Sequence, residues 1–179
     1  MKPRLILADE PVSMVDASLR ATILAALAGM NAERGISIVY ITHDLATAYQ
    51  ISDNILVLYR GTVAEVGDVE LVVKRPRHPY TQLLVSSIPQ ASAERSWIGG
   101  TAPAPGAIHD GDGVGCAFAA RCPSVAARCR EASPPLFRTE PHRAVSCYLH
   151  GSAPAMSPES LGSVFAEPAG PRRAGARGD

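Results

Sequence analysis

Several features that would narrow the class of this protein are scarce or missing from its sequence. No run of about 18 apolar residues occurs, so the sequence predicts no transmembrane helix. Lys plus Arg and Asp plus Glu are both 17, and the net charge of zero gives no general attraction toward nucleic acid. Aromatic residues make up only 5% of the chain, against 46% hydrophobic residues. We therefore expect an aliphatic core and no nucleic-acid partner.

The first residues lack the pattern of a secretion signal. A basic start, Met1–Arg4, is followed by an apolar stretch, but this stretch meets Asp9 and Glu10 after a few residues and has no small-residue cleavage site. Residues 5–8 are therefore interpreted as a buried strand. We expect a cytoplasmic protein whose association with any membrane is indirect.

The order of strand and helix patterns predicts an α/β fold. Between residues 17 and 33 apolar side chains recur at helical spacing, and Gly35 fits a helix C-terminus. Strands at 5–8 and 36–41 flank this helix, which predicts a right-handed strand–helix–strand unit with parallel strands. Further strands are expected over 54–59 and 62–66, joined as a hairpin by a turn at Arg60 and Gly61. Further helices are expected over 44–51, over 69–74 and from Pro79 up to Pro89. We expect a mainly parallel sheet covered by helices.

The composition changes twice along the second half of the chain. Residues 90–115 are rich in Gly, Ala, Pro and Ser, which indicates a linker, and all four cysteines follow within residues 116–147. From Gly151 onward few apolar residues remain, and we expect disorder. The expected domains are the main α/β part over 1–75, a small irregular cysteine-bearing extension over 76–150 and a disordered tail over 151–179.

Two carboxylates and one histidine follow the first two expected strands. Asp9 and Glu10 end the first strand, and His43 comes just after the second. Ligands of open α/β sheets bind at the carboxyl ends of the strands, so these groups are expected to share one edge. Hydrolysis of a phosphate ester needs a carboxylate for Mg²⁺, a group that orients water and a polar group near the terminal phosphate. Each of these residues alone is also consistent with an ordinary strand terminus. The prediction of phosphate-ester hydrolysis therefore depends on the three residues occurring together.

The motifs at residues 5–11, 13–16 and 41–44 resemble those of one family, the ATP-binding subunits of bacterial dipeptide and oligopeptide ABC importers. Residues 5–11, LILADEP, resemble the Walker B motif; residues 13–16, SMVD, resemble the D-loop; and residues 41–44, ITHD, resemble the switch-histidine motif. Residues 76–89 and the segment that holds Cys116, Cys122, Cys129 and Cys147 resemble the C-terminal extension of these importer ATPases. Val15 stands where the family usually has Leu.

The resemblance implies roles for individual residues. Asp9 would help to hold Mg²⁺, Glu10 would polarise the attacking water and His43 would contact the γ-phosphate of ATP. Asp16, with Ser13 in the same loop, would lie where two nucleotide-binding domains meet. Asp9, Ser13 and Asp16 would together be the cofactor-binding residues.

The motifs that cradle the phosphates in this family do not occur in the chain. We find no G-x-x-x-x-G-K-[ST] loop, no Q-loop and no Ser-Gly-Gly signature motif. We therefore expect the chain alone to bind ATP poorly and not to turn it over, as a truncated form of a longer parent.

The four cysteines leave the nature of their site open. They are separated by five, six and seventeen residues, whereas zinc sites usually contain C-x₂₋₄-C pairs, and disulfides are disfavoured in a cytosolic setting. An iron–sulfur cluster tolerates wider spacing, and four unliganded thiols are a further possibility. The resemblance implies a [4Fe–4S] cluster on these four residues. His78, in His-Pro-Tyr-Thr, is interpreted as a packing or capping residue.

Two functions follow from these patterns. The first is an ATP-hydrolysing subunit, using ATP and Mg²⁺ in the intact parent, that powers peptide uptake. Its partners would be a second ABC ATPase subunit, the membrane permease subunits and, indirectly, a peptide-binding protein, and it would lie on the cytoplasmic face of the inner membrane. The alternative is a catalytically inactive fragment that serves as a metal-bearing interaction module.

Overall fold

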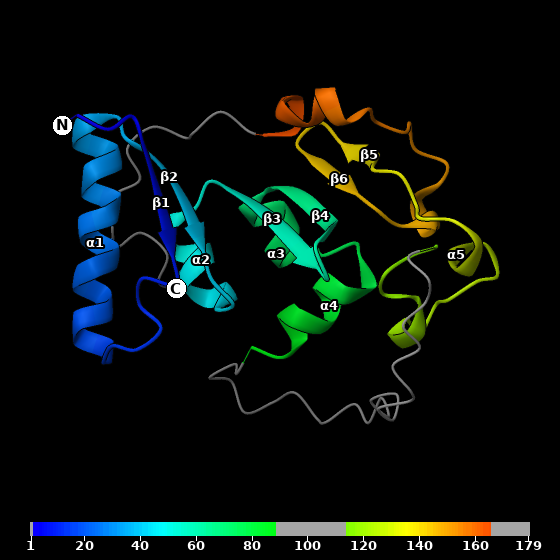
Figure 1. The fold of residues 1–179 in the computed structure, drawn as a ribbon, viewed down its shortest axis with the longest axis horizontal. Helices are drawn as coiled ribbons and strands as arrows, with labels where there is room; N and C mark the ends of the chain where they lie inside the picture. The colour runs from blue at the N-terminus through cyan, green and yellow to red at the C-terminus, as the bar shows by residue number, and fades with distance from the viewer. Residues whose placement is uncertain (1, 89–113, 166–179) are drawn as a thin grey trace. The chain divides into compact units, whose positions relative to one another are not determined.

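The computed structural model describes residues 2–88 and 114–165 (Figure 1). Along the chain the strands are β1 (Leu5–Asp9), β2 (Ser37–Ile41), β3 (Asn54–Tyr59), β4 (Thr62–Asp68), β5 (Phe137–Glu140) and β6 (Arg143–Val145). The α-helices are α1 (Ala17–Arg34), α2 (Leu45–Ile51), α3 (Val69–Lys74), α4 (Pro79–Ser86) and α5 (Arg128–Glu131). Three short 3₁₀ helices, η1 (Ala119–Arg121), η2 (Tyr148–His150) and η3 (Pro158–Val164), complete the described elements. None of the helices in the described ranges combines the length and the apolar character that a membrane span requires.

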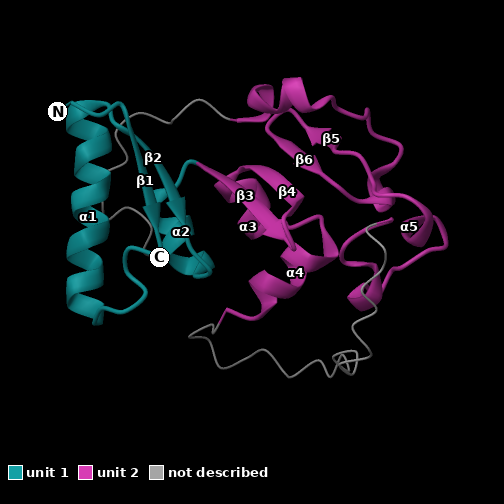
Figure 2. Ribbon diagram, in the orientation of Figure 1, with its two compact units in different colours: residues 1–53, 167–179 teal, residues 54–166 magenta. Residues whose placement is uncertain are grey.

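The described residues form two compact units that divide between Asp53 and Asn54 (Figure 2). The first unit is the expected strand–helix–strand arrangement, in which β1 and β2 pair in parallel with Leu7 opposite Val39. Helix α1 begins at the cap residue Asp16 and ends at Gly35, whose φ of 63° is the left-handed conformation that glycine adopts easily.

The second unit contains a four-stranded sheet in the order β3-β4-β6-β5, and every pairing in it is antiparallel. The expectation of a mainly parallel sheet is therefore not confirmed: in the described residues only β1 and β2 pair in parallel. The reason is local for β3 and β4, because a two-residue turn at Arg60 and Gly61, both with positive φ, forces antiparallel pairing. For β6 the reason is not local, because this three-residue strand reaches β4 from far along the chain.

Two small cores cover the two faces of this sheet. Val57, Ala64 and Val72 form one, with Tyr80 and Leu84 of α4 packed against it. Val66, Ala144 and Val164 form the other. Val164 lies in η3, so part of the segment for which we expect disorder is ordered, because its few apolar side chains cover the sheet.

The domain boundaries at residues 75 and 150 stay predictions, although the β4–β6 pairing joins residues on either side of the first of them. The remainder of the expected disordered tail, residues 166–179, and nearly all of the expected linker over 90–115 lie outside the described residues.

Candidate functional site

The structure brings Glu10 and His43 together at the carboxyl ends of β1 and β2. Glu10 follows β1 directly, and its backbone N–H donates to the carbonyl of Ile41 at 2.9 Å. Its φ of 47° is unusual for a residue other than glycine. The Glu10 carboxylate Oε1 lies 2.7 Å from Nδ1 of His43, which is hydrogen-bonding distance. The expected proximity of these two groups is thus present, and their catalytic roles stay predictions.

Both members of this pair are accessible to a ligand. The side chain of His43 is 77% exposed and that of Glu10 is 38% exposed. The hydrogen bond that His43 donates to Glu10, together with the charge of Glu10 and a smaller effect of Asp44, raises the pKa of His43 above its ordinary value of 6.5. In such a pair the carboxylate can accept a proton from water. The imidazole can place a positive charge near a phosphate.

The other residues expected at this site lie on the same unit. Asp9 is the exposed last residue of β1, opposite Ile41. Ser13 donates to the carbonyl oxygen of Glu10 through its backbone N–H at 3.2 Å and its hydroxyl at 3.1 Å. Ser13 therefore helps to fix the turn that presents Glu10.

Asp16 is engaged with the start of α1. Its Oδ1 accepts from the backbone N–H groups of Ser18 and Leu19, each at 3.0 Å, and from the Ser18 hydroxyl at 2.7 Å. The hydrogen bond from the Leu19 backbone, followed by that from the Ser18 side chain, lowers the pKa of Asp16. None of the hydrogen bonds found in the described residues links Asp16 to Glu10 or His43, and its place in a nucleotide interface stays a prediction.

The structure adds one residue to this site that the sequence interpretation left without a role. Asp44 accepts from the backbone N–H of Ala46 at 2.9 Å and thereby caps α2. Its own N–H donates to the hydroxyl of Thr42 at 3.0 Å, and its carboxylate lies 3.7 Å from a guanidinium nitrogen of Arg20. His43 therefore sits between two residues that are fixed by hydrogen bonds. An Asp immediately before a helix is a capping signal, and it could have indicated this role.

The four expected metal ligands, Cys116, Cys122, Cys129 and Cys147, line one cavity of the second unit. All are free thiols, and Cys116 and Cys129 are joined by a backbone hydrogen bond of 2.8 Å. Burial, with a contribution from the neighbouring cysteines, raises the pKa of the Cys122 and Cys147 thiols. In the ranges 2–88 and 114–165, however, no three or more His, Cys, Asp or Glu side chains form a group that could hold a metal ion. The iron–sulfur cluster is thus not supported by the structure.

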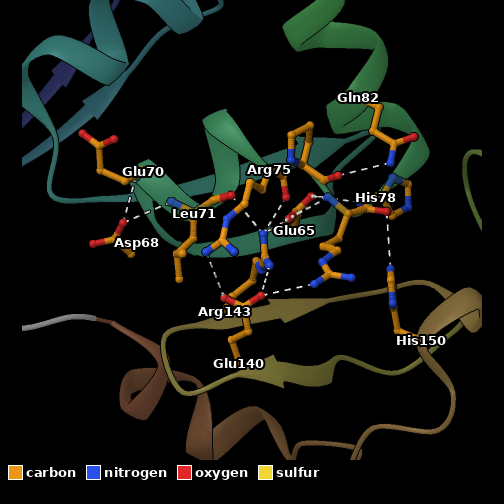
Figure 3. Close-up of polar contacts among 12 residues, drawn as sticks. Glu65, Asp68, Glu70, Leu71, Arg75, His78, Gln82, Glu140, Arg143 and His150 are labelled. Carbon is orange, nitrogen blue, oxygen red and sulfur yellow. Dashed lines mark hydrogen bonds and ion pairs between the residues drawn. The ribbon is translucent and has the colours of Figure 1, made fainter.

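The second unit also contains a buried polar network, most of which the sequence does not predict. Figure 3 shows its contacts. Glu65 and Arg143 are both fully buried. The Glu65 carboxylate accepts from the backbone N–H groups of Arg77 at 3.1 Å and His78 at 2.9 Å. Arg143 donates to the carbonyls of Leu71 at 2.9 Å and Arg75 at 2.6 Å, and it also contacts Glu140. The network thus joins β4 and β6 to the connection between α3 and α4.

His78 is the expected capping residue. Its Nδ1 accepts from the backbone N–H of Tyr80 at 3.0 Å, at the start of α4. Burial, followed by the charge of His150, lowers the pKa of His78 to about 4, while a hydrogen bond with the Ser146 backbone acts in the opposite direction. His78 is therefore neutral near pH 7.

Comparison with known proteins confirms the resemblance to peptide-importer ATP-binding subunits. Residues 64–129 match the family model described as the oligopeptide/dipeptide transporter, C-terminal region. The chain is 36% identical to a probable peptide ABC transporter ATP-binding protein, y4tS, of Sinorhizobium fredii. The alignment spans 168 residues, which are 92% of this chain and 47% of that protein. It is 36% identical to the putative oligopeptide transport ATP-binding protein YkfD of Bacillus subtilis, over 86% of this chain and 47% of that protein.

A third relative is the oligopeptide transport ATP-binding protein OppF of Salmonella typhimurium, 39% identical over 82% of this chain and 44% of that protein. The chain therefore spans about half the length of the curated relatives it matches. These similarities give no support to the alternative interpretation as a metal-bearing interaction module.

Proposed function

We propose that this chain supplies the water-orienting part of the ATP-binding subunit of a peptide importer. The observation that carries the proposal is the 2.7 Å contact between Glu10 and His43 at the ends of two parallel strands. It occurs in a chain that is 36% identical to a probable peptide ABC transporter ATP-binding protein. The reaction is hydrolysis of ATP, coupled to peptide uptake.

Each residue of the site has a separate task in this proposal. Glu10 orients the attacking water and receives its proton, and the imidazole of His43 holds a γ-phosphate oxygen. Asp9 would hold Mg²⁺, whose charge offsets that of the phosphates. Asp44 and Ser13 keep His43 and Glu10 in place through their hydrogen bonds. Asp16, with Ser13, would face a second ATP-binding subunit.

The partners follow from the same proposal. An importer ATPase of this kind works with a second ATPase subunit and with membrane permease subunits, and indirectly with a peptide-binding protein. It would lie at the cytoplasmic face of the membrane. Since this sequence contains no phosphate-binding loop, the phosphates must be cradled by a segment that the chain does not contain.

The four cysteines would carry a [4Fe–4S] cluster in this proposal. The four thiols form no group that could hold a metal in the described residues, so binding would have to draw them together. The argument for the cluster is that all four line one cavity, together with Arg128, whose positive charge favours a bound anionic centre. The cluster would stabilise the loop-rich segment around it. Anaerobic purification and analysis for iron, sulfide and zinc would test this. Iron and sulfide in equal amounts are expected, and metal-free protein with four titratable thiols would contradict it.

The ATPase function is tested in a subunit of full length. The matching half of the Sinorhizobium fredii y4tS protein would be replaced by this chain, and Mg²⁺-dependent ATP hydrolysis measured. Glu10→Gln is expected to slow hydrolysis by about 10²-fold or more with ATP binding retained, because the group that orients and deprotonates water is lost. Glu33→Gln, an exposed change on α1, is the matched control. Equal hydrolysis by the parent chimera and its Glu10→Gln variant would contradict the proposal.

A further inference from the structure

His43 stands between two carboxylates just after the end of β2. The Glu10 carboxylate lies 2.7 Å from its Nδ1, and Asp44 follows it directly in the chain. A ligand with a terminal phosphate brings further negative charge to the same place, and charges of equal sign repel each other. Binding at His43 is therefore favoured by a positive charge that offsets one of the two carboxylates and leaves the imidazole accessible.

The two oxygens of the Asp44 carboxylate have different partners. Oδ1 accepts from the backbone N–H groups of Ala46 at 2.9 Å and Thr47 at 3.4 Å, and it thereby caps α2. Oδ2 lies 3.7 Å from Nη1 of Arg20, a residue of α1. The helix cap thus uses one oxygen of the carboxylate, and a guanidinium group faces the other.

The position of Arg20 is constrained by more than its charge. Its backbone N–H donates to the carbonyl of Asp16 at 2.9 Å, in the first turn of α1. Its Nε is buried and has no hydrogen-bond partner within the described residues, although the side chain as a whole is 39% exposed. A buried donor without a partner is unfavourable, and a side chain with this access to water would ordinarily turn the donor outward. The guanidinium is thus directed toward Asp44 at some cost.

We propose that Arg20 is a positioning residue for His43 and acts on it through the Asp44 carboxylate. The guanidinium fixes the oxygen of Asp44 that the helix cap does not use, and it offsets the charge of Asp44 beside a bound phosphate. The distance of 3.7 Å between nitrogen and oxygen is longer than a hydrogen bond, so this contact can tighten when an anion binds at the imidazole. The role in ATP hydrolysis rests on the proposed function, whereas the coupling of Arg20 to His43 does not.

The coupling is tested first on the chain alone, by NMR titration of the His43 imidazole. Among the described residues, Glu10 and Asp44 are the charged groups that raise its pKa, and Glu10 acts more strongly. Arg20→Gln should raise the pKa further, because the charge of Asp44 is no longer offset. Asp44→Asn should lower it, since asparagine still caps α2 but carries no charge.

A double variant shows whether Arg20 acts through Asp44. In the Asp44→Asn background, Arg20→Gln should change the pKa of His43 by less than half as much as it does in the parent chain, because the carboxylate that links the two is gone. An equal change in both backgrounds would overturn the proposal, as would a pKa of His43 that Arg20→Gln leaves unaltered. Exposed ion pairs contribute little to stability, so these variants are expected to fold.

A matched control removes the same charge from the other end of the same helix. Arg34 lies in the exposed last turn of α1, about 21 Å from Arg20 along the helix axis. Arg34→Gln should leave the pKa of His43 unchanged. Arg20→Lys retains the positive charge, and its titration should remain closer to that of the parent chain than the titration of Arg20→Gln does.

The effect on the reaction is tested in the full-length chimera with y4tS. Arg20→Gln should lower kcat for ATP hydrolysis by about fivefold, the largest factor expected from one exposed ion pair, while the KM for ATP changes less than twofold. Arg20→Lys should restore most of the rate, and Arg34→Gln should match the parent chimera. Equal kcat values for the parent and Arg20→Gln chimeras would overturn the positioning role.

These measurements distinguish the positioning role from the proposed function. If the parent and Glu10→Gln chimeras hydrolyse ATP equally, the proposed function fails, and the coupling measured on the chain alone still stands or falls by its own titrations. If Glu10→Gln slows hydrolysis and Arg20→Gln does not, the proposed function is supported and the role of Arg20 is overturned.

Discussion

Among single residues, Glu10 and His43 carry the phosphate chemistry that is proposed for the first unit. Glu10 holds His43 through one hydrogen bond of 2.7 Å in an exposed position, so the pair is available to a ligand. The contact favours the charged imidazolium, because the partner is a carboxylate. The pair is therefore strongest below the ordinary pKa of 6.5 and weakens as the pH rises through the higher pKa of the folded state.

The first prediction is that His43 titrates above pH 6.5 in the folded chain. Glu10→Gln should lower the pKa of His43 toward 6.5, because it removes the hydrogen-bonded charge. NMR titration of the imidazole signals measures both values, and Glu33→Gln should leave the pKa of His43 unchanged. A parent value at or below 6.5 would contradict the geometry of this pair.

The second prediction concerns acid sensitivity at His78. Its pKa is about 4 in the folded chain and 6.5 ordinarily, so the unfolded chain takes up the proton at a higher pH. Above pH 6.5, neutral His78 makes its full contribution to the free energy of unfolding. This contribution, roughly 3 kcal/mol, is lost as the pH drops toward 4. Protonation would also remove the acceptor of the Tyr80 hydrogen bond.

Urea unfolding at pH 7, 5.5 and 4.5 measures this loss. His78→Asn retains a capping side chain and should reduce the dependence on pH, whereas the exposed His142→Asn should not. An unchanged pH dependence in His78→Asn would show that other groups cause it.

Some of these residues could be predicted from sequence and others could not. Asp9, Glu10 and His43 follow strands that are evident from apolar runs, so their shared edge could be predicted. The cap at His78 is a local signal as well. Glu65 and Arg143 could not be found, because their partners are distant in sequence: Arg143 binds the carbonyl of Leu71, 72 residues away.

Among the elements, local signals predicted the helices and strands better than their pairing. Helix α1 was expected at 17–33 and occupies Ala17–Arg34, because its cap residue and Gly35 mark its ends. In the antiparallel sheet of the second unit the hairpin of β3 and β4 is predicted correctly, whereas the pairing of β6 with β4 and β5 is not predicted. Strand β6 contains only Arg143, Ala144 and Val145, which is too short for a visible alternation, and β4 supplies its pairing.

The third prediction concerns the close approach of β4 and β6 at Gly67. A Cβ at this position would lie 2.1 Å from the carbonyl oxygen of His142, and its φ of 151° is unfavourable for other residues. Gly67→Ala should therefore destabilise the second unit by more than about 2 kcal/mol, as a backbone shift is required. Thermal or urea unfolding measures the effect.

Gly29 provides the opposite case as a control. It lies inside α1, where an added Cβ comes no closer than 4.0 Å to another group. Gly29→Ala should stabilise the chain by about 0.5–1 kcal/mol, since alanine loses less entropy in a helix. If Gly67→Ala were neutral, the described pairing of β4 with β6 would be incorrect.

In the whole molecule, the two units differ in how completely their cores are buried. The second unit has aliphatic side chains with no exposed surface, which include Val66, Val72 and Val164. In the described part of the first unit, the most buried aliphatic side chains retain 4–7% exposure, those of Val12, Leu24, Leu27, Ile36 and Ala48. The strand residues Leu5, Leu7, Val39 and Ile41 are 44–66% exposed. The strands that contain them also end at the candidate site.

The last prediction is that the first unit unfolds before the second. Hydrogen exchange followed by mass spectrometry in increasing urea should show β1 and β2 opening at a lower concentration than β4 and β6, because each unit depends on its own core. Leu27→Ala should lower the first midpoint by an amount equivalent to about 2–5 kcal/mol, and Phe137→Ala should lower the second by about 3–5 kcal/mol. Each variant is the control for the other. Simultaneous opening of all four strands, with both midpoints shifted by either substitution, would show that the chain unfolds as one cooperative body.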